Sequence, residues 1–481
     1  MRNPDRKTDT GARRRPGAWR LLLLPLALAA GLAHASASQD AGATGPITAL
    51  ENLASVKELP ATPQARRHFD IQHWVTASGV RVYFVAADEL PMLDVRLVFD
   101  AGAARDGALG GLASVASRML DDGTPTRDAS AIAAGFESVG AEFGASSHRD
   151  MAVVELRVLS EPAFREPALE VLADVVANAA YPADAYARAR KSSEIGQQQQ
   201  EQSPAAIAGR VFYQGLYGDH PYAHPPTGTR ESLAKITRED LVAFHDRYYV
   251  ARNLTLALVG KVSRAEAEAI AERIGKALPA GEPAPALPEV QRLGKSRHLH
   301  RSFPSAQTHI IMGQPGIRYG SPDYYALLLG NEILGGGGFT SRLMDELRTK
   351  RGMTYGAYSG FQQMRAEGPF QISLSTRADQ ADEALRVIRG LLGEFVKQGP
   401  REAELVAAKA NIVGSFPLST ASNDSIIGFL GAIGFYGLPL DYLDNYVAKI
   451  EAVTAADVRD ALRRTLRPER MLVVTVGQGQ P

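Results

Sequence analysis

Apolar residues follow two different spacings along this chain. Alternating or continuous apolar runs at Val80 to Phe84 and Leu93 to Phe99 predict strands. Apolar residues three and four positions apart predict helices in six further segments: Gly111 to Leu120, Ala129 to Val139, Pro162 to Ala179, Tyr324 to Leu334, Ser341 to Thr349 and Ala381 to Gln398. This alternation predicts an α+β fold in which helices pack on one face of a mixed β-sheet.

Two passages far apart in the chain share one pattern. Thr237 opens a helical segment that the strand pattern Asn253 to Gly260 follows, and Thr454 opens another that the strand pattern Arg470 to Gly477 follows. Each threonine has an acidic residue in the next turn, which is typical of a helix N-cap. A repeat of this length predicts two homologous lobes, each with its own sheet.

A stretch rich in proline, alanine and glycine, Leu278 to Pro288, separates the two copies and is typical of a linker. We therefore predict a first lobe at residues 66–278, a linker at 279–295 and a second lobe at 296–481. Residues 38–65 are interpreted as a leader segment that precedes the first lobe.

The N-terminus has the pattern of an export signal. Four arginines, Arg13, Arg14, Arg15 and Arg20, precede an apolar run from Leu21 to Ala33. Small residues at alternate positions follow this run, so residues 1–37 are predicted to be a signal peptide that is removed. An uncleaved anchor is the alternative. Later in the chain no apolar run reaches the ~18 residues of a spanning helix, so stable membrane insertion is not expected.

Composition narrows the possible environments and partners. Lysine plus arginine and aspartate plus glutamate each number 53, so no net charge points to nucleic acid or an anionic membrane. Cysteine is absent, which excludes disulfides, thiol catalysis and a thiolate zinc site. An exported chain without cysteine is expected in a bacterial periplasm.

A specific string lies in the second predicted lobe. Asn331 to Leu343 reads NEILGGGGFTSRL, and Asp345 to Tyr355 reads DELRTKRGMTY. This string resembles the C-terminal domain of the insulinase/pitrilysin zinc metallopeptidases, the family of the mitochondrial processing peptidase. The resemblance covers residues 66–479 and implies the two-lobed fold of the processing peptidases.

The resemblance also implies a zinc site in the first lobe, where the family has an inverted His-x-x-Glu-His on a helix. Its two histidines bind zinc and its glutamate is the general base. Here Ser114 and Arg118 stand at the histidine positions and Ser117 at the glutamate position. The third ligand position falls on Ser193 or Glu194. Neutral hydroxyls and a permanently protonated guanidinium do not hold catalytic zinc, so neither a metal nor another cofactor is expected in this chain.

Other parts of the family pattern remain. The resemblance matches Arg348 and Tyr355 to an Arg/Tyr pair that contacts the substrate backbone, and it adds Gly335, Gly336, Gly337 and Gly338 as a place where a peptide backbone could approach closely. The alternatives are purely structural roles: Arg348 caps a helix, Tyr355 packs beside Phe361 on a strand, and the glycines form a turn with positive φ.

Further polar clusters are interpreted as structural. His220 and His224 are four apart but lie between prolines, so their spacing does not place them on one helix face. His298 and His300 form the second close pair. The run Gln197 to Gln202 is interpreted as a solvated helix end.

These observations predict the non-catalytic, substrate-positioning subunit of a periplasmic zinc metallopeptidase. Its partner would be a homologous subunit with His-x-x-Glu-His intact, which would hold the zinc, and the substrates would be unfolded peptides. Two alternatives remain open: a structural or interaction protein with no peptidase role, and an autonomous peptidase with unrecognised metal ligands.

Overall fold

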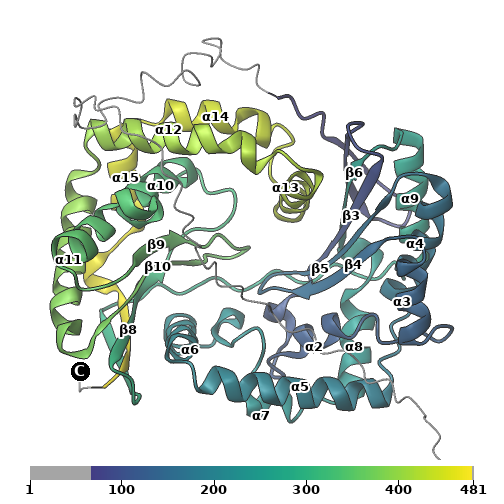
Figure 1. Ribbon diagram of the computed structural model, residues 1–481, viewed down its shortest axis with the longest axis horizontal. Coiled ribbons are helices and arrows are strands. Elements are labelled where there is room, and N and C mark those ends of the chain that lie inside the picture. The colour runs from purple at the N-terminus through teal and green to yellow at the C-terminus, as the bar shows by residue number, and fades with distance from the viewer. Residues whose placement is uncertain (1–66, 479–481) are drawn as a thin grey trace, which may run out of the picture. The chain divides into compact units, whose positions relative to one another are not determined.

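The computed structural model describes residues 67–478. The predicted signal peptide and leader, residues 1–65, lie outside the described residues. In the described part the chain contains two β-sheets, each associated with helices from both halves of the sequence (Figure 1). Across residues 67–478 no helix is both long enough and apolar enough to span a bilayer.

The first sheet has six strands in the order β1-β2-β6-β3-β5-β4. Strands β2 and β6 are parallel, and the other neighbours are antiparallel. Every residue of β6 is buried, as expected for a Val- and Leu-rich inner strand. The strands are β1 (Gln72–Val75), β2 (Arg81–Ala86), β3 (Met92–Phe99), β4 (Glu142–Ser147), β5 (Ala152–Leu159) and β6 (Leu254–Gly260).

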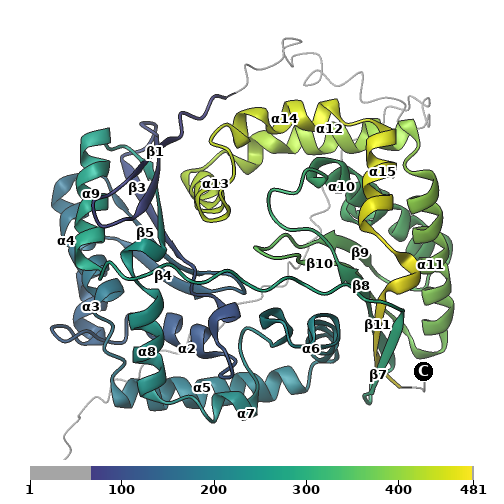
Figure 2. The same ribbon diagram turned by 180° about the vertical axis from the view of Figure 1, so that it is seen from behind.

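The second sheet has five strands in the order β7-β11-β8-β10-β9. Its one parallel pair, β7 and β11, lies at one edge (Figure 2). The strands are β7 (Arg297–Ser302), β8 (Gln307–Pro315), β9 (Ala357–Phe361), β10 (Pro369–Arg377) and β11 (Leu472–Gly477). Without the hairpin strand β1, the first sheet has the same order and directions, so the predicted duplication is confirmed at the level of topology.

Helices of the first half follow the predicted segments closely. Thr237 and Thr454 both form reciprocal capping boxes, with Asp240 and Asp457 respectively, so the predicted N-caps are confirmed. The helices of this half are α2 (Leu112–Arg118), α3 (Ala129–Glu137), α4 (Pro162–Ala177), α5 (Ala183–Glu201), α6 (Pro204–Tyr217), α7 (Arg230–Leu233), α8 (Arg238–Tyr248) and α9 (Arg264–Ala277).

In the second half, two of the predicted helices contain wider turns. The helix α10 (Tyr324–Asn331) continues as a π-helical turn, η5 (Glu332–Gly336), and a second π-helical segment, η7 (Met344–Lys350), occupies most of the segment predicted at 341–349. Such turns are rare and often lie at functional sites. The remaining helices are α11 (Ala381–Gln398), α12 (Glu402–Ser419), α13 (Asn423–Tyr436), α14 (Tyr442–Ala452) and α15 (Ala455–Thr465).

Each half of the chain contributes one helix to the sheet of the other half. Helix α13 packs on β6, β3 and β2 of the first sheet, and α6 packs on β11 and β8 of the second (Figure 1). Ile426, Leu430 and Ile433 of α13 share an apolar cluster with Tyr83 and Val85. The mixed α+β fold with two lobes is confirmed, and the exchanged helices add cover that the sequence pattern did not predict.

Candidate functional site

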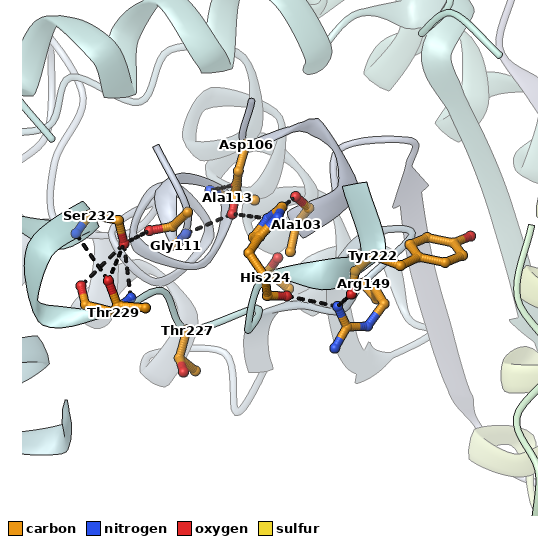
Figure 3. A network of polar contacts seen from close by, with 12 residues as sticks. Ala103, Asp106, Gly111, Ala113, Arg149, Tyr222, His224, Thr227, Thr229 and Ser232 are labelled. Carbon is orange, nitrogen blue, oxygen red and sulfur yellow. Dashed lines mark hydrogen bonds and ion pairs between the residues drawn. The ribbon is translucent and has the colours of Figure 1, made fainter. Parts of the chain in front are cut away.

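The helix that carries the predicted zinc positions is held at its N-terminus by a buried carboxylate. Asp106 accepts hydrogen bonds from the backbone N–H groups of Gly111 (2.6 Å) and Ala113 (2.7 Å), which precede and begin α2 (Figure 3). Gly111 has φ of 97°, a conformation that favours glycine. The turn before α2 is therefore fixed by the carboxylate rather than by a side chain of the helix.

A histidine from a distant loop completes this arrangement. His224 Nε2 lies 2.8 Å from the carbonyl of Ala103 and 3.2 Å from Asp106 Oδ2. Burial raises the pKa of Asp106, while hydrogen bonds from His224, Ala113 and Gly111 act to lower it. Figure 3 shows how this loop continues through Thr227 to Thr229 and Ser232, where the Ser232 hydroxyl donates to the carbonyl of Gly110 (2.6 Å).

Two of the residues at the predicted zinc positions, Arg118 and Ser193, are in contact. Arg118 Nη2 donates to Ser193 Oγ at 2.6 Å, which joins α2 to α5 across 75 residues of sequence. Ser193 in turn donates to the carbonyl of Ala189. Glu194 lies 3.4 Å from Arg190 on its own helix. The structure therefore brings Ser193, and not Glu194, to the second histidine position.

The donor groups at these positions do not fit zinc. Ser114 is half-buried, Ser117 is fully buried, and Arg118 presents a guanidinium that cannot lose its proton. Burial lowers the pKa of Arg118, and Asp122 opposes this shift. Among residues 67–478, no three or more histidine, aspartate and glutamate side chains are placed to hold a metal ion.

Arg348 lies within η7, and its side chain is not used by the fold. Its guanidinium carbon lies 4.5 Å from the centroid of the Phe339 ring, a distance typical of a cation–π contact. Within residues 67–478 this guanidinium makes no ion pair or side-chain hydrogen bond. Phe339 is itself 72% exposed, so its ring faces solvent, while Arg348 is half-buried.

Tyr355 differs from its predicted place. It precedes β9, which begins at Ala357, so it is not on the strand. Its side chain is 86% exposed, whereas Phe361 packs against Phe370. The alternative that Tyr355 packs beside Phe361 is therefore wrong, because the chain has not yet entered the sheet at this residue. Packing in the core therefore gives no reason for a tyrosine at this position.

The four glycines serve two purposes in the structure. Only Gly338 has a positive φ, of 59°, so the expectation of a positive-φ turn holds for one of the four. A Cβ on buried Gly335 would lie 2.6 Å from the backbone nitrogen of Ser359, and one on Gly336 would lie 2.7 Å from Asn331 Nδ2. Gly337 meets the carbonyl of Glu332 in the same way. Close packing in and after η5 accounts for these three.

The other polar clusters are mostly structural, with one exception. His220 Nε2 lies 3.0 Å from the carbonyl of Pro288, and His298 and His300 both contact the Thr475 hydroxyl, as ordinary structural histidines do. Gln197 is the exception in the run predicted to be a solvated helix end: it is buried and donates to the carbonyl of Thr227 at 2.9 Å, whereas Gln198, Gln199, Gln200 and Gln202 are exposed. In the described chain, only this side chain of the helix end forms hydrogen bonds to the 225–228 loop.

Asp106 was not singled out from the sequence. No local capping pattern marks it, because it stands five residues before the N-cap Gly111 and not at the cap position itself. Arg149, which donates to the carbonyls of Tyr222 and His224 (Figure 3), has no local signal either because its partners lie more than 70 residues away.

Comparison with known proteins agrees with this arrangement. Residues 84–229 match the family described as "Insulinase (Peptidase family M16)", and residues 235–412 match "Peptidase M16 inactive domain". A crystal structure of a peptidase M16 inactive domain from Pseudomonas fluorescens is 44% identical and covers 85% of this chain and 99% of its own, with a TM-score of 0.83. A protease structure from Helicobacter pylori is 18% identical, covers 85% and 100%, and has a TM-score of 0.79. An uncharacterized zinc protease of Mycobacterium leprae is 27% identical over 87% of this chain and 94% of its own.

Proposed function

Because the chain belongs to the insulinase family, peptidase family M16, we propose that it is the non-catalytic, substrate-positioning subunit of a periplasmic zinc metallopeptidase. The catalytic subunit would be a homologue that keeps His-x-x-Glu-His and holds the zinc. The substrates would be unfolded peptides. The observations that carry this proposal are the contact of Arg348 with the exposed ring of Phe339, the exposure of Tyr355, and the loss of zinc donors at Ser114, Ser117 and Arg118.

Arg348 and Tyr355 have the chemistry that substrate positioning needs. A guanidinium and a phenol can both donate to a carbonyl oxygen, and donors fixed before reaction favour the charge that develops there. The ring of Phe339 limits the orientations of Arg348, so its donors point in a restricted set of directions. Because the zinc must come from elsewhere, these donors would act on a peptide held at the partner's metal site.

Location and partner rest on sequence features. The arginine-flanked apolar run at residues 1–37 supports export, and the absence of cysteine suits a chain that needs no disulfide in a periplasm. The matched structure from Pseudomonas fluorescens is named an inactive domain, which supports a separate catalytic subunit for this chain.

The proposal is tested by reconstitution. The purified chain alone should bind no zinc stoichiometrically and hydrolyse no unfolded peptide, while mixing it with a His-x-x-Glu-His homologue from the same organism should produce hydrolysis that neither chain shows alone. One chelator-removable zinc per chain would support the autonomous peptidase instead. A stable complex with no gain in hydrolysis would support a structural role.

A further inference from the structure

A cavity next to the degenerate zinc position carries an unbalanced positive charge. It lies between α5, α6 and the 225–228 loop and has a volume of about 240 Å³. This is far above the roughly 10–15 Å³ that one water needs. No aspartate or glutamate of the described chain lines it, and its polar lining comes from Arg149, Arg210, Gln197, Gln200, Tyr213 and Thr227.

Arg149 is held in place while part of its guanidinium remains uncommitted. Nη1 donates to the carbonyls of Tyr222 (2.5 Å) and His224 (2.8 Å), and the guanidinium carbon lies 3.9 Å from the centroid of the Tyr213 ring. The Tyr213 hydroxyl is fixed by Gln362 at 2.5 Å. No carboxylate in residues 67–478 lies within ion-pairing distance of Arg149. A planar fork stacked on a ring and anchored at one nitrogen is suited to receiving an anion.

The carboxylates of the described chain that act electrostatically on these two arginines form no ion pair with them. Asp150 follows Arg149 in sequence, but its oxygens accept from the hydroxyls of Tyr222 (2.5 Å) and Tyr436 (3.1 Å) and from the backbone of Arg365. Glu231 acts on Arg210 only through longer-range electrostatics. Burial lowers the pKa of the Arg149 guanidinium, and this outweighs the opposing electrostatic effect of Asp150 and the surrounding tyrosines.

The remaining lining indicates what kind of anion would fit. Ile207, Pro225, Pro226 and Ala206 form apolar walls beside the two guanidinium groups. Gly209 also lines the cavity, and a Cβ at this position would meet no atom within 4 Å. A space that combines two cations with apolar walls is larger and less polar than a site for a small inorganic anion.

We propose that the cavity lined by Arg149 and Arg210 is a subsite that binds a carboxylate of a peptide, with the adjoining apolar segment seated against Ile207 and the prolines. The site is continuous with the degenerate zinc region, because Gln197 follows Ser193 by one turn of α5. The proposal rests on the proposed function only in taking a peptide as the ligand, and it adds a preference for acidic or free C-terminal ends.

Binding to the full mature chain, without its partner, tests this subsite. A fluorescent peptide without acidic side chains and with a free C-terminal carboxylate should bind at least about tenfold more tightly than its C-terminally amidated twin. An amidated peptide with one internal glutamate separates the two sources of a carboxylate. If the glutamate peptide binds more tightly than the plain amide, the site accepts a side-chain carboxylate. If only the free acid binds more tightly than the plain amide, the site accepts the C-terminal carboxylate, and either result supports the subsite.

Variants separate the charge from the space. Arg210→Gln should bring the free acid to the affinity of the amide, and it is expected to fold because Arg210 makes no hydrogen bond or ion pair with the described residues. Gly209→Leu should weaken both peptides by filling the cavity. Arg190→Gln is the matched control, since it removes an exposed charge from α5 outside the cavity and should change nothing.

Equal affinity of all three peptides, the free acid, its amide and the amidated glutamate peptide, would overturn the proposal. So would a preference that survives both Arg210→Gln and Arg149→Gln, or inorganic phosphate binding in the cavity with no preference between the peptides. These outcomes are independent of the proposed function, because reconstituted hydrolysis that depends on Arg348 could still be observed when the carboxylate preference is absent.

Discussion

Arg348 and Tyr355 are the residues on which the proposed function turns, and the fold explains neither side chain. Buried arginines elsewhere are paired or stacked for structural reasons, as Arg342 is with Glu404 and the Phe395 ring. Arg348 has only the exposed ring of Phe339, and Tyr355 is 86% exposed. Side chains that stability does not require are suited to a contact with another molecule.

Arg348→Ala and Tyr355→Phe should leave folding and partner binding intact but lower the turnover of the reconstituted heterodimer. Losing one fixed oxyanion donor typically costs ~10²–10³ in rate, and a partly solvated donor costs less. Arg348→Lys keeps the charge without the planar fork, so it should rescue only in part. Turnover of a labelled peptide at saturating partner measures the effect.

Arg351→Ala is the control for this test, because it removes a nearby exposed charge that interacts with Glu346 at 3.5 Å. It should keep full turnover. If both the Arg348→Ala and the Tyr355→Phe heterodimers turned over at the unaltered rate, the structural role would be favoured.

Glu404 fixes the segment that leads into η7 and should show this in its pH dependence. Burial acts to raise its pKa, but hydrogen bonds from Arg342 and Arg401 outweigh burial and lower it from 4.5 to about 2. A lowered pKa adds stability above the unfolded pKa, and this is lost as pH falls toward the folded value. Glu404→Gln should therefore cost about 1.5–3 kcal/mol at neutral pH, and the cost should shrink between pH 4.5 and 2.

Chemical denaturation at several pH values measures this loss. Glu402→Gln, an exposed position in the same first turn of α12, is the control and should have little effect at any pH. A cost for Glu404→Gln that stayed constant down to pH 2 would show that the ion pair with Arg342 is not its source.

Single residues also show how far sequence can go. The resemblance identified Ser114, Ser117 and Arg118 as altered zinc positions and left the third position open between Ser193 and Glu194. The contact between Arg118 and Ser193 shows which of these two side chains reaches the second histidine position, and the sequence could not predict that contact. Gln197 looked solvated because glutamine is usually exposed, whereas its position beneath a distant loop decided its burial. Local patterns do not encode contacts between distant segments.

At the scale of elements, the spacing of apolar residues and the helix-capping residues predicted most helices and strands. They did not predict which helical turns are α-helical and which are π-helical. Apolar spacing alone does not distinguish an α-helix from the π-helical turns η5 and η7. Tyr355 was assigned to a strand for a similar reason, since the chain enters β9 only at Ala357. The packing of α6 and α13 on the opposite sheets could not be predicted either. An amphipathic pattern shows that one face of a helix is buried, but it does not show which element covers that face.

Glycine permits the close approach of α13 to the first sheet. A Cβ on Gly434 would lie 2.5 Å from Thr255 Cγ2 and closer still to Tyr83 Cε2. Gly434→Ala should therefore destabilise the chain by about 1–3 kcal/mol through overpacking, despite the better helix propensity of alanine. Thermal or chemical unfolding measures the loss.

Gly428 provides a control on the same helix. A Cβ there would meet no atom within 4 Å, so Gly428→Ala should be neutral or stabilise by up to about 1 kcal/mol. Equal effects of the two substitutions would mean that helix propensity, and not contact with the sheet, governs both positions.

At the scale of the whole molecule, the two halves of the described chain are tied together rather than merely joined. Helix α13 covers the first sheet and α6 covers the second. Asp150, in the turn between β4 and β5, accepts from Tyr222 of the first half and from Tyr436 and Arg365 of the second. The duplication was predicted correctly from the sequence. The two lobes are not independent, however, because each one's core includes a helix from the other half.

This sharing predicts that neither half folds normally alone. A chain of residues 66–278 would expose the apolar surface of Tyr83 and Val85 that α13 covers, and it would carry α6 with no sheet to pack against. Each fragment should therefore show little cooperative unfolding and should aggregate or bind a hydrophobic dye. Residues 66–278 and 296–481 expressed together should associate and recover a cooperative transition, because each supplies the helix that the other lacks. Calorimetry of the unbroken chain should show one main transition. Two fragments that each unfold cooperatively on their own, at temperatures close to that of the whole chain, would show that the exchanged helices contribute little to stability.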